Sequence, residues 1–188
     1  MEDKALETIR IMLGRRKLET KTDRVVTEDI ERVNLYTVGG VLVVFSQKDK
    51  GLLDRDITKI LEFAEANSYT NGIILVSLSP PSENVLRVVK SYVKNKVQFF
   101  HIRQLQFDIT THRMAVPHRI MNEDERTAVF KQYRITNPEQ QIPWIDSQDA
   151  MAKWIGAVPG DMVEVIRHSD VAGPKLFYRY CVEDVNVA

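Results

Sequence analysis

The chain of 188 residues and 21.7 kDa is long enough for one ordinary domain or two small ones. A hydrophobic fraction of 44% and a charged fraction of 28% are typical of a globular protein and exclude a disordered chain or a coiled coil. Basic and acidic residues number 26 each, so the overall charge does not indicate a nucleic-acid partner, and the single cysteine excludes an internal disulfide framework. No apolar run approaches the ~18 residues of a membrane span, and the N-terminus does not resemble a signal peptide, so we expect no membrane partner.

The first half of the chain alternates helical and extended patterns. Apolar residues at helical spacing predict helices over 3–18, over 53–67 and from Ser82 onward. A continuous β-branched run predicts a buried strand over 41–45, an apolar run predicts a second over 73–76, and Val97-Gln98-Phe99-Phe100 predicts a third strand. Residues 19–37 are polar and mixed and support no assignment. The order of strands and helices favours an α/β layer with right-handed crossovers, which we assign to an N-terminal domain of residues 1–105.

The second half, residues 106–188, has shorter elements typical of a small α+β domain. Strands are predicted over 107–109, 162–166 and 176–182. Asn122 and Glu125 form a capping box for one helix, which we expect to end at Asn137-Pro138. Ser147 is the expected N-cap of a second, short helix that ends at Gly156.

Charge is distributed unevenly along the chain. Residues 1–105 hold 17 basic and 14 acidic side chains, whereas residues 106–188 hold 9 and 12. The helix that begins at Pro81-Ser82 carries Arg87, Lys90 and Lys94 at spacings that place them on one stripe. That stripe and the free backbone N–H groups at the helix start could contact the phosphates of DNA without reading bases. The alternative interpretation is an ordinary solvated face rich in lysine.

A second basic cluster is Arg15, Arg16 and Lys17. The asymmetry suggests that the first half faces a polyanion while the second half meets protein.

No pattern in the chain indicates catalysis, a metal or a cofactor. The four histidines lack the spacing and companion ligands of a zinc site, and Cys181 lies in a predicted strand, where a buried structural thiol is the usual role. The glycines match neither dinucleotide-binding nor P-loop spacing. We therefore expect no catalytic residue, no metal, no cofactor and no small-molecule substrate.

From Val116 onward the sequence resembles a known family. The segments are Val116-Pro117-His118, 142–145, 149–156 and, above all, GDMVEVIRHSDVAGPKLFYRYCV at 160–182. They are similar to the small subunit common to multisubunit RNA polymerases, which archaeal enzymes contain and which is the shared fifth subunit of the eukaryotic nuclear enzymes. In the closing segment nine positions match the family pattern: Gly160, Asp161, Val163, Arg167, Ser169, Ala172, Gly173, Tyr178 and Arg179.

The resemblance implies a non-catalytic subunit of DNA-directed RNA polymerase. The C-terminal domain would dock on the largest subunit, and the N-terminal half would be a jaw domain with a mixed sheet of restriction-endonuclease-like topology beside downstream duplex DNA. The implied assembly surface comprises Arg167, Ala172, Gly173, Tyr178 and Arg179, and the alternative is a hairpin that only closes its own sheet. Trp144 and Trp154 would either contact another subunit or pack in the core.

The chain also departs from the family pattern. Trp144, Ala150-Met151 and Glu83 replace residues usual in the family, and the negative charge of Glu83 disfavours a DNA contact beside Pro81-Ser82. These departures suggest a copy from a large cytoplasmic DNA virus of the asfarvirus type, located in host cytoplasm and virion, whereas a cellular copy would be nuclear. The competing functions are a nuclease-like enzyme and a free-standing DNA-binding adaptor.

Overall fold

The computed structural model describes residues 1–26, 32–47, 54–69, 71–91, 96–169 and 173–183. The chain divides into two compact units, Met1–Ile109 and Thr110–Ala188. This division lies four residues beyond the boundary expected from the sequence. Each unit contains its own β-sheet.

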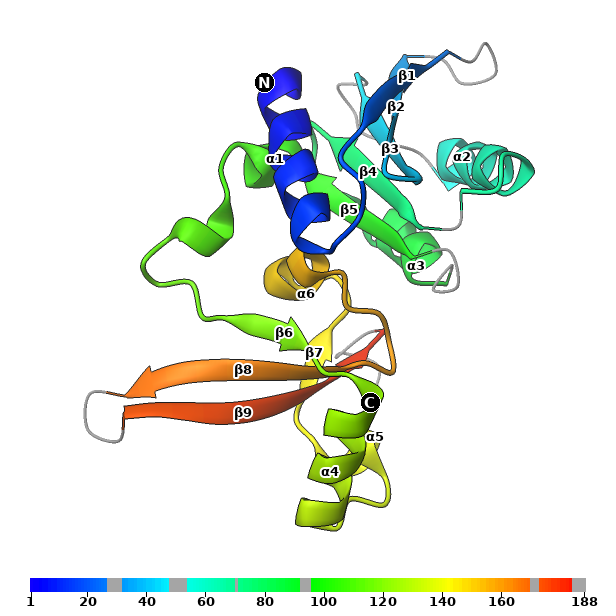
Figure 1. Ribbon diagram of the computed structural model, residues 1–188. Coiled ribbons are helices and arrows are strands. Elements are labelled where there is room, and N and C mark those ends of the chain that lie inside the picture. Colours follow the sequence, from blue (N-terminus) through cyan, green and yellow to red (C-terminus); the bar gives the residue numbers. More distant parts are fainter. Residues whose placement is uncertain (27–31, 48–53, 70, 92–95, 170–172, 184–188) are drawn as a thin grey trace. The chain divides into compact units, whose positions relative to one another are not determined.

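The N-terminal unit is built on a five-stranded mixed sheet in the order β1-β2-β3-β4-β5 (Figure 1). The strands are β1 (Thr22–Val25), β2 (Val33–Val38), β3 (Val41–Ser46), β4 (Ile73–Ser77) and β5 (Val97–His101). Strands β1 to β3 pair antiparallel and β3 to β5 pair parallel, which confirms the predicted mixed sheet and the three strands predicted for it. Strands β1 and β2 lie almost entirely within residues 19–37, where the sequence pattern supports no assignment.

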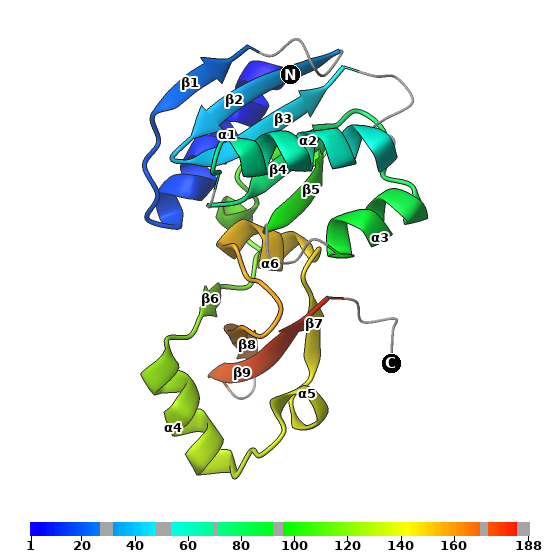
Figure 2. The same ribbon diagram turned by 90° about the vertical axis from the view of Figure 1, so that its right-hand side faces the viewer.

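Helices cover both faces of this sheet. Helix α1 (Glu2–Arg15) lies on one face, and α2 (Asp54–Ala66) and α3 (Glu83–Ser91) lie on the other (Figure 2). Every residue of β3 and of β4 is buried, because both faces of these strands are covered. The core under α2 and α3 includes Leu42, Ile60 and Leu75.

A two-residue turn joins β2 to β3. Gly39 and Gly40 both have positive φ, +57° and +76°, as a hairpin turn that matches the twist of the strands requires. A Cβ at position 39 would lie 2.1 Å from the carbonyl oxygen of Glu19, so only glycine fits there. This turn sets the register in which Val38 pairs with Val41.

The C-terminal unit holds a four-stranded sheet in the order β6-β8-β9-β7. Its strands are β6 (His118–Ile120), β7 (Trp144–Asp146), β8 (Met162–Ser169) and β9 (Gly173–Val182), and its helices are α4 (Glu123–Tyr133), α5 (Pro138–Gln141) and α6 (Ala150–Ile155). One small core joins Ala152 of α6 to Val163 and Cys181, and another joins Val129 of α4 to Met162. Opposite faces of β8 and β9 thus contribute to two separate cores.

Three local predictions in the second half were wrong. Residues 107–109 form no strand, and a 3-10 helix spans Ile109–Thr111. Helix α4 ends at Tyr133, where Arg134 adopts the left-handed conformation, and Asn137-Pro138 begins α5 because a proline fits the first turn of a helix. Asp149 caps α6 in place of Ser147, since its carboxylate accepts the N–H groups of Met151 and Ala152.

Neither a membrane-spanning helix nor a metal cluster is found in the described part of the chain. No helix there is long and apolar enough to cross a bilayer. Likewise, among those residues no three His, Cys, Asp or Glu side chains are grouped so that they could hold a metal ion. Cys181 is fully buried in the core that it shares with Ala152 and Val163, and burial raises the pKa of its thiol to about 12. The thiol therefore has the structural role expected for it.

Candidate docking surface on the C-terminal hairpin

The β8–β9 hairpin extends beyond the strands that flank it. Strand β6 pairs with β8 only at Val163–Val165, and β7 pairs with β9 only at Tyr180–Val182. Residues 167–169 and 173–179, which we call the outer hairpin, therefore lack a flanking strand and project from the sheet (Figure 1). A two-stranded ribbon is marginally stable in water by itself, so this segment benefits from a partner.

Large apolar side chains are exposed on the outer hairpin. Leu176 is 54% exposed and Phe177 is 41% exposed. Because successive residues of a strand point to opposite faces, each face of β9 carries one of these exposed apolar side chains. Adjacent exposed apolar side chains on a projecting element are typical of a protein-binding surface.

The Phe177 face of the outer hairpin also carries three cations. Arg167 lies directly opposite Lys175 in the strand register, and Arg179 is on the same face. Like charges in this position repel, and no carboxylate among the described residues lies within ion-pair distance of these three side chains. The Arg167 guanidinium lies 5.3 Å from the centre of the Phe177 ring. This face is therefore suited to a partner that supplies negative charge.

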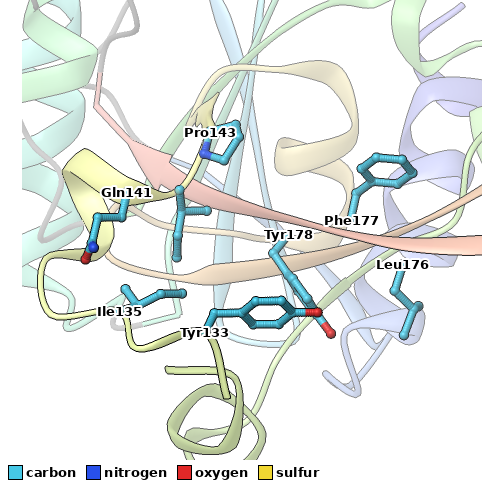
Figure 3. A pocket seen from close by; sticks show the side chains of 8 residues that line it. Tyr133, Ile135, Gln141, Pro143, Leu176, Phe177 and Tyr178 are labelled. Atoms are coloured by element: carbon cyan, nitrogen blue, oxygen red, sulfur yellow. The ribbon is translucent and has the colours of Figure 1, made fainter. Parts of the chain in front are cut away.

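The opposite face of β9 borders an open hollow of about 590 Å³. Residues from the end of α4 and the turn after it, from the α5–β7 segment and from β9 line it: Tyr133, Ile135, Gln141, Ile142, Pro143, Leu176, Phe177 and Tyr178. Figure 3 shows the side chains of Leu176 and Tyr178 on the Tyr133 side of the strand, with Phe177 on the other side. The rings of Tyr133 and Tyr178 meet edge to face at 6.1 Å, and Tyr133 remains 57% exposed. The hollow therefore offers an aromatic and aliphatic lining beside a strand edge.

The structure brings four of the predicted assembly residues together on the hairpin. Arg167 is exposed, Tyr178 and Arg179 are half-buried, and Gly173 begins β9 with φ of +69°. Ala172 lies outside the described residues. The inner part of β9 is buried and the outer hairpin is exposed, and the choice between an assembly surface and a hairpin that only closes its own sheet stays a prediction.

The two tryptophans differ in their surroundings. Trp144 in β7 is half-buried, and its indole N–H donates a hydrogen bond to the carbonyl oxygen of Glu139. Trp154 in α6 is 2% exposed, which favours packing within the chain over a contact with another subunit. The structure thus places Trp144 beside the hollow's α5 wall and does not bring Trp154 to the outer hairpin.

Arg119 fixes the elements beneath the hairpin. Its guanidinium, on β6, binds the Glu125 carboxylate of α4 at 2.7 Å and the Glu164 carboxylate of β8 at 3.0 Å. These hydrogen bonds raise the pKa of Arg119, and the contact with Arg119 lowers the pKa of Glu125. The Asn122 side chain accepts the N–H of Glu125, whose carboxylate accepts the N–H of Asn122, which confirms the capping box. The sequence offers no signal for the Arg119 contacts.

The predicted DNA-facing residues lie at the start of α3. The Ser82 hydroxyl accepts the N–H of Val85 at 3.3 Å, which confirms Ser82 as the cap, and Pro81 is half-buried beside it. Arg87 is exposed and donates to the Asn84 side chain at 3.3 Å. Lys90 lies in α3, and Lys94 lies outside the described residues. Of the three predicted cations, the side chain that the structure describes is therefore that of Arg87.

The other basic cluster is largely engaged within the N-terminal unit. Arg15 forms an ion pair with Asp108 at 2.5 Å, and Arg16 donates to the side-chain oxygen of Gln98 at 2.9 Å. Burial lowers the pKa of Arg16 to about 10. Residues 15–17 therefore do not form an open basic patch, because two of the three cations have structural contacts.

Sequence reasoning missed Leu176 and Phe177 as surface residues. The signal was present, because the run Leu176-Phe177-Tyr178 breaks the polar–apolar alternation of a strand with one face in water. A strand with three consecutive apolar residues between Lys175 and Arg179 is either buried on both faces or available to a partner.

Comparison with known proteins places the C-terminal unit in a described family. The family "RNA polymerase Rpb5, C-terminal domain" matches residues 107–181. DNA-directed RNA polymerase subunit Rpo5 of Pyrococcus abyssi is 42% identical over 79 residues, which are 42% of this chain and 94% of the relative. Rpo5 of Methanococcoides burtonii is 39% identical over 77 residues, which are 41% of this chain and 96% of the relative.

A eukaryotic relative matches a longer part of the chain. The Dictyostelium discoideum subunit rpabc1 of DNA-directed RNA polymerases I, II and III is 26% identical over 128 residues, which are 67% of this chain and 64% of the relative. This stretch is longer than the C-terminal unit, so the similarity reaches into the N-terminal unit as well.

Proposed function

The chain belongs to the Rpb5/Rpo5 family of RNA polymerase subunits, and we propose that its outer hairpin docks it on the largest subunit of a multisubunit DNA-directed RNA polymerase. Family membership makes it a non-catalytic accessory subunit whose partners are other subunits of that enzyme. Nucleotidyl transfer therefore takes place on other chains, and the nuclease-like alternative has no support from the family. This chain therefore contributes binding surfaces to the polymerase.

The observation that carries the docking proposal is the exposure of Leu176 and Phe177 on a hairpin without flanking strands. Burying both side chains would stabilise the complex by about 25 cal/mol for each Å² of apolar surface removed from water. Large apolar side chains at the centre of an interface carry most of its affinity. The cations of the Phe177 face would gain carboxylate partners in the same step.

Replacement of the two apolar side chains tests the proposal. We expect the double variant Leu176→Asp with Phe177→Asp to be incorporated into the polymerase at least about ten-fold less well, because two charged groups would have to be buried. The measurement is co-purification of polymerase with the tagged full chain, after circular dichroism has shown that the variant folds.

Phe107→Asp is the control, since Phe107 is an aromatic residue with 54% exposure that lies outside the outer hairpin. We expect this control to be incorporated normally. Normal incorporation of the double variant would show that another surface docks the chain.

We propose further that the start of α3 lies along the backbone of downstream duplex DNA. Support comes from the exposed Arg87 and from the absence of acidic residues between Asn84 and Phe107. Contacts of this kind strengthen binding without sequence preference, because they neutralise phosphates and release counterions. Glu83 at the first position of α3 opposes such a contact at the helix start itself, which leaves the side of the helix as the contact surface.

The salt dependence of DNA binding tests this proposal. The variant Arg87→Glu with Lys90→Glu should weaken retention of DNA by the assembled polymerase and reduce the slope of log K against log salt by about 0.9 for each phosphate that the variant no longer neutralises. Arg55→Glu with Lys59→Glu, on exposed positions of neighbouring α2, is the control and should leave the slope unchanged. Equal slopes for both variants and the original chain would exclude a DNA contact by α3.

The sequence departures at Trp144, Ala150-Met151 and Glu83 support a narrower proposal about the source of the chain. We infer a copy encoded by a large cytoplasmic DNA virus, which would act in host cytoplasm and virion. Immunolocalisation checks this inference, because a chain found in the nucleus would be the cellular copy. The restriction-endonuclease-like topology of the N-terminal sheet remains a prediction of the same resemblance.

A further inference from the structure

We propose that the outer edge of β9 is completed by an extended segment of another polymerase chain, which pairs with the backbone at Leu176 and Tyr178 and places an apolar side chain in the hollow. This inference rests on the proposed docking function and specifies its geometry. The occupant is a β-strand rather than a helix or a loop, because an open strand edge offers a row of backbone donors and acceptors.

The direction of the backbone groups follows from two hydrogen bonds. The N–H of Tyr180 donates to the Pro143 carbonyl oxygen on the β7 side at 3.0 Å, and the N–H of Cys181 donates to the Asp161 carbonyl oxygen on the β8 side at 2.9 Å. Since the sides alternate along a strand, the N–H and C=O groups of Tyr178 and Leu176 point to the same side as those of Tyr180.

No strand of the described chain occupies that side of β9 at Leu176 and Tyr178. Strand β7 pairs with β9 at Tyr180, Cys181 and Val182 only. Preceding it, Pro143 has no N–H, and Ile142 donates its own N–H to the Pro138 carbonyl oxygen. The intramolecular pairing therefore stops at Tyr180, and an incoming strand would continue the position of β7 in the sheet.

The hollow identifies the side chains that the incoming strand would present. Its lining includes Ile135, Ile142 and Pro143, together with the rings of Tyr133 and Tyr178 (Figure 3). A strand that pairs with Tyr178 projects alternate side chains toward this lining, so an aliphatic or aromatic residue fits there. On the opposite face the same strand would lie beside Lys175 and Arg179 of β9, which favours an acidic residue at the neighbouring position.

The sequence of β9 lacks most of the features that protect an edge strand from pairing. Native edges are commonly shielded by inward charges, bulges or proline, whereas this one exposes Leu176 and Phe177. Pro174 stands two residues before Leu176, and thus at a position whose backbone nitrogen also points outward. Because Pro174 offers no N–H, the added strand is expected to end at Leu176. Pro174 also shows that the hairpin accepts proline at a position whose backbone nitrogen points outward.

A proline substitution at Leu176 separates backbone pairing from side-chain packing. Leu176→Pro removes an outward N–H and the leucine side chain without removing a β8–β9 hydrogen bond, while Leu176→Ala removes only the side chain. We expect Leu176→Pro to be incorporated into the assembled polymerase roughly five- to hundred-fold less well than Leu176→Ala, because the partner's carbonyl would be buried without a donor. Circular dichroism of the free full chains checks that both fold, and hydrogen exchange supplies a readout that needs no variant.

In the original chain the amides of Leu176 and Tyr178 should exchange quickly when the chain is free and at least about ten-fold more slowly in the polymerase. The amides of Phe177 and Arg179 are already bonded to β8 and should change less.

The outcomes separate this inference from the docking proposal. Equal incorporation of the proline and alanine variants, together with loss of incorporation in the Leu176→Asp, Phe177→Asp variant, would overturn strand pairing and retain docking by side chains. Normal incorporation of all three variants would overturn both. Dimerisation of the free chain that Leu176→Pro abolishes would show that a second copy is the occupant, and would overturn the partner proposed here.

Discussion

At the scale of single residues, Arg119 shows how one side chain joins three elements. It connects β6 to Glu125 of α4 and Glu164 of β8, next to the hairpin that we propose as the docking element. We expect Arg119→Ala to lower the urea midpoint of the full chain at pH 7 modestly, because ion pairs at half-exposed groups are screened by water. Arg113→Ala, at an exposed position in the same unit, is the control and should leave the midpoint unchanged.

The difference in urea midpoint between the original chain and Arg119→Ala depends on pH through the pKa of Glu125. Because Arg119 lowers that pKa below its ordinary value of 4.5, the ion pair stabilises the fold above pH 4.5, and this stabilisation disappears as the pH falls through the lowered value. The urea midpoints of the original chain and of Arg119→Ala, measured between pH 7 and pH 3, should therefore become more similar as the pH falls. A difference that stays constant or grows on acidification would contradict the assignment.

Residue-level prediction from the sequence succeeded where the signal is local. The capping box of Asn122 and Glu125 and the cap at Ser82 each depend on residues three apart, which the sequence displays directly. It failed for Arg119, whose partner Glu164 is 45 residues away. Arg16 looked like part of a basic patch because nothing nearby in sequence reveals its contact with Gln98.

At the scale of elements, the caps of the C-terminal helices make different contributions. Asn122 accepts an N–H at the start of α4, whereas the side chain of Asn137 makes no capping hydrogen bond at the start of α5. We expect Asn122→Ala to lower the free energy of unfolding by about 1 kcal/mol and Asn137→Ala to lower it by much less. Urea unfolding of the full chain measures both, and equal losses would contradict the cap geometry.

Strands were predictable in proportion to their burial. The continuous apolar runs of β3 and β4 identify them at once, because both faces of these strands are covered, and β5 is recognisable from Val97, Phe99 and Phe100. Strands β1 and β2 are only partly buried, and their mixed composition hid them, although the Gly39-Gly40 pair before β3 is a hairpin signal. Strands β6 and β7 contain three residues each, which is too short for periodicity to show.

At the scale of the whole molecule, the chain combines two units with different expected tasks. The N-terminal unit carries the excess of basic residues, and the C-terminal unit carries the family match and the exposed hairpin. In the sequence, the change from long alternating strands and helices to shorter elements places the expected boundary near residue 105. The open edge of β9 was not predictable, because strand pairing beyond a hairpin depends on where β6 and β7 stop.

The central claim is that the outer hairpin contacts the largest polymerase subunit. Cross-linking of lysines in the purified polymerase, followed by mass spectrometry, tests it most directly, because Lys175 is exposed on the outer hairpin and Lys59 is exposed on α2 of the other unit. The account predicts cross-links from Lys175 to the largest subunit, whichever subunit Lys59 reaches. Cross-links from Lys175 only to other subunits, or a Lys175 that reacts as a free surface lysine in the intact enzyme, would contradict it.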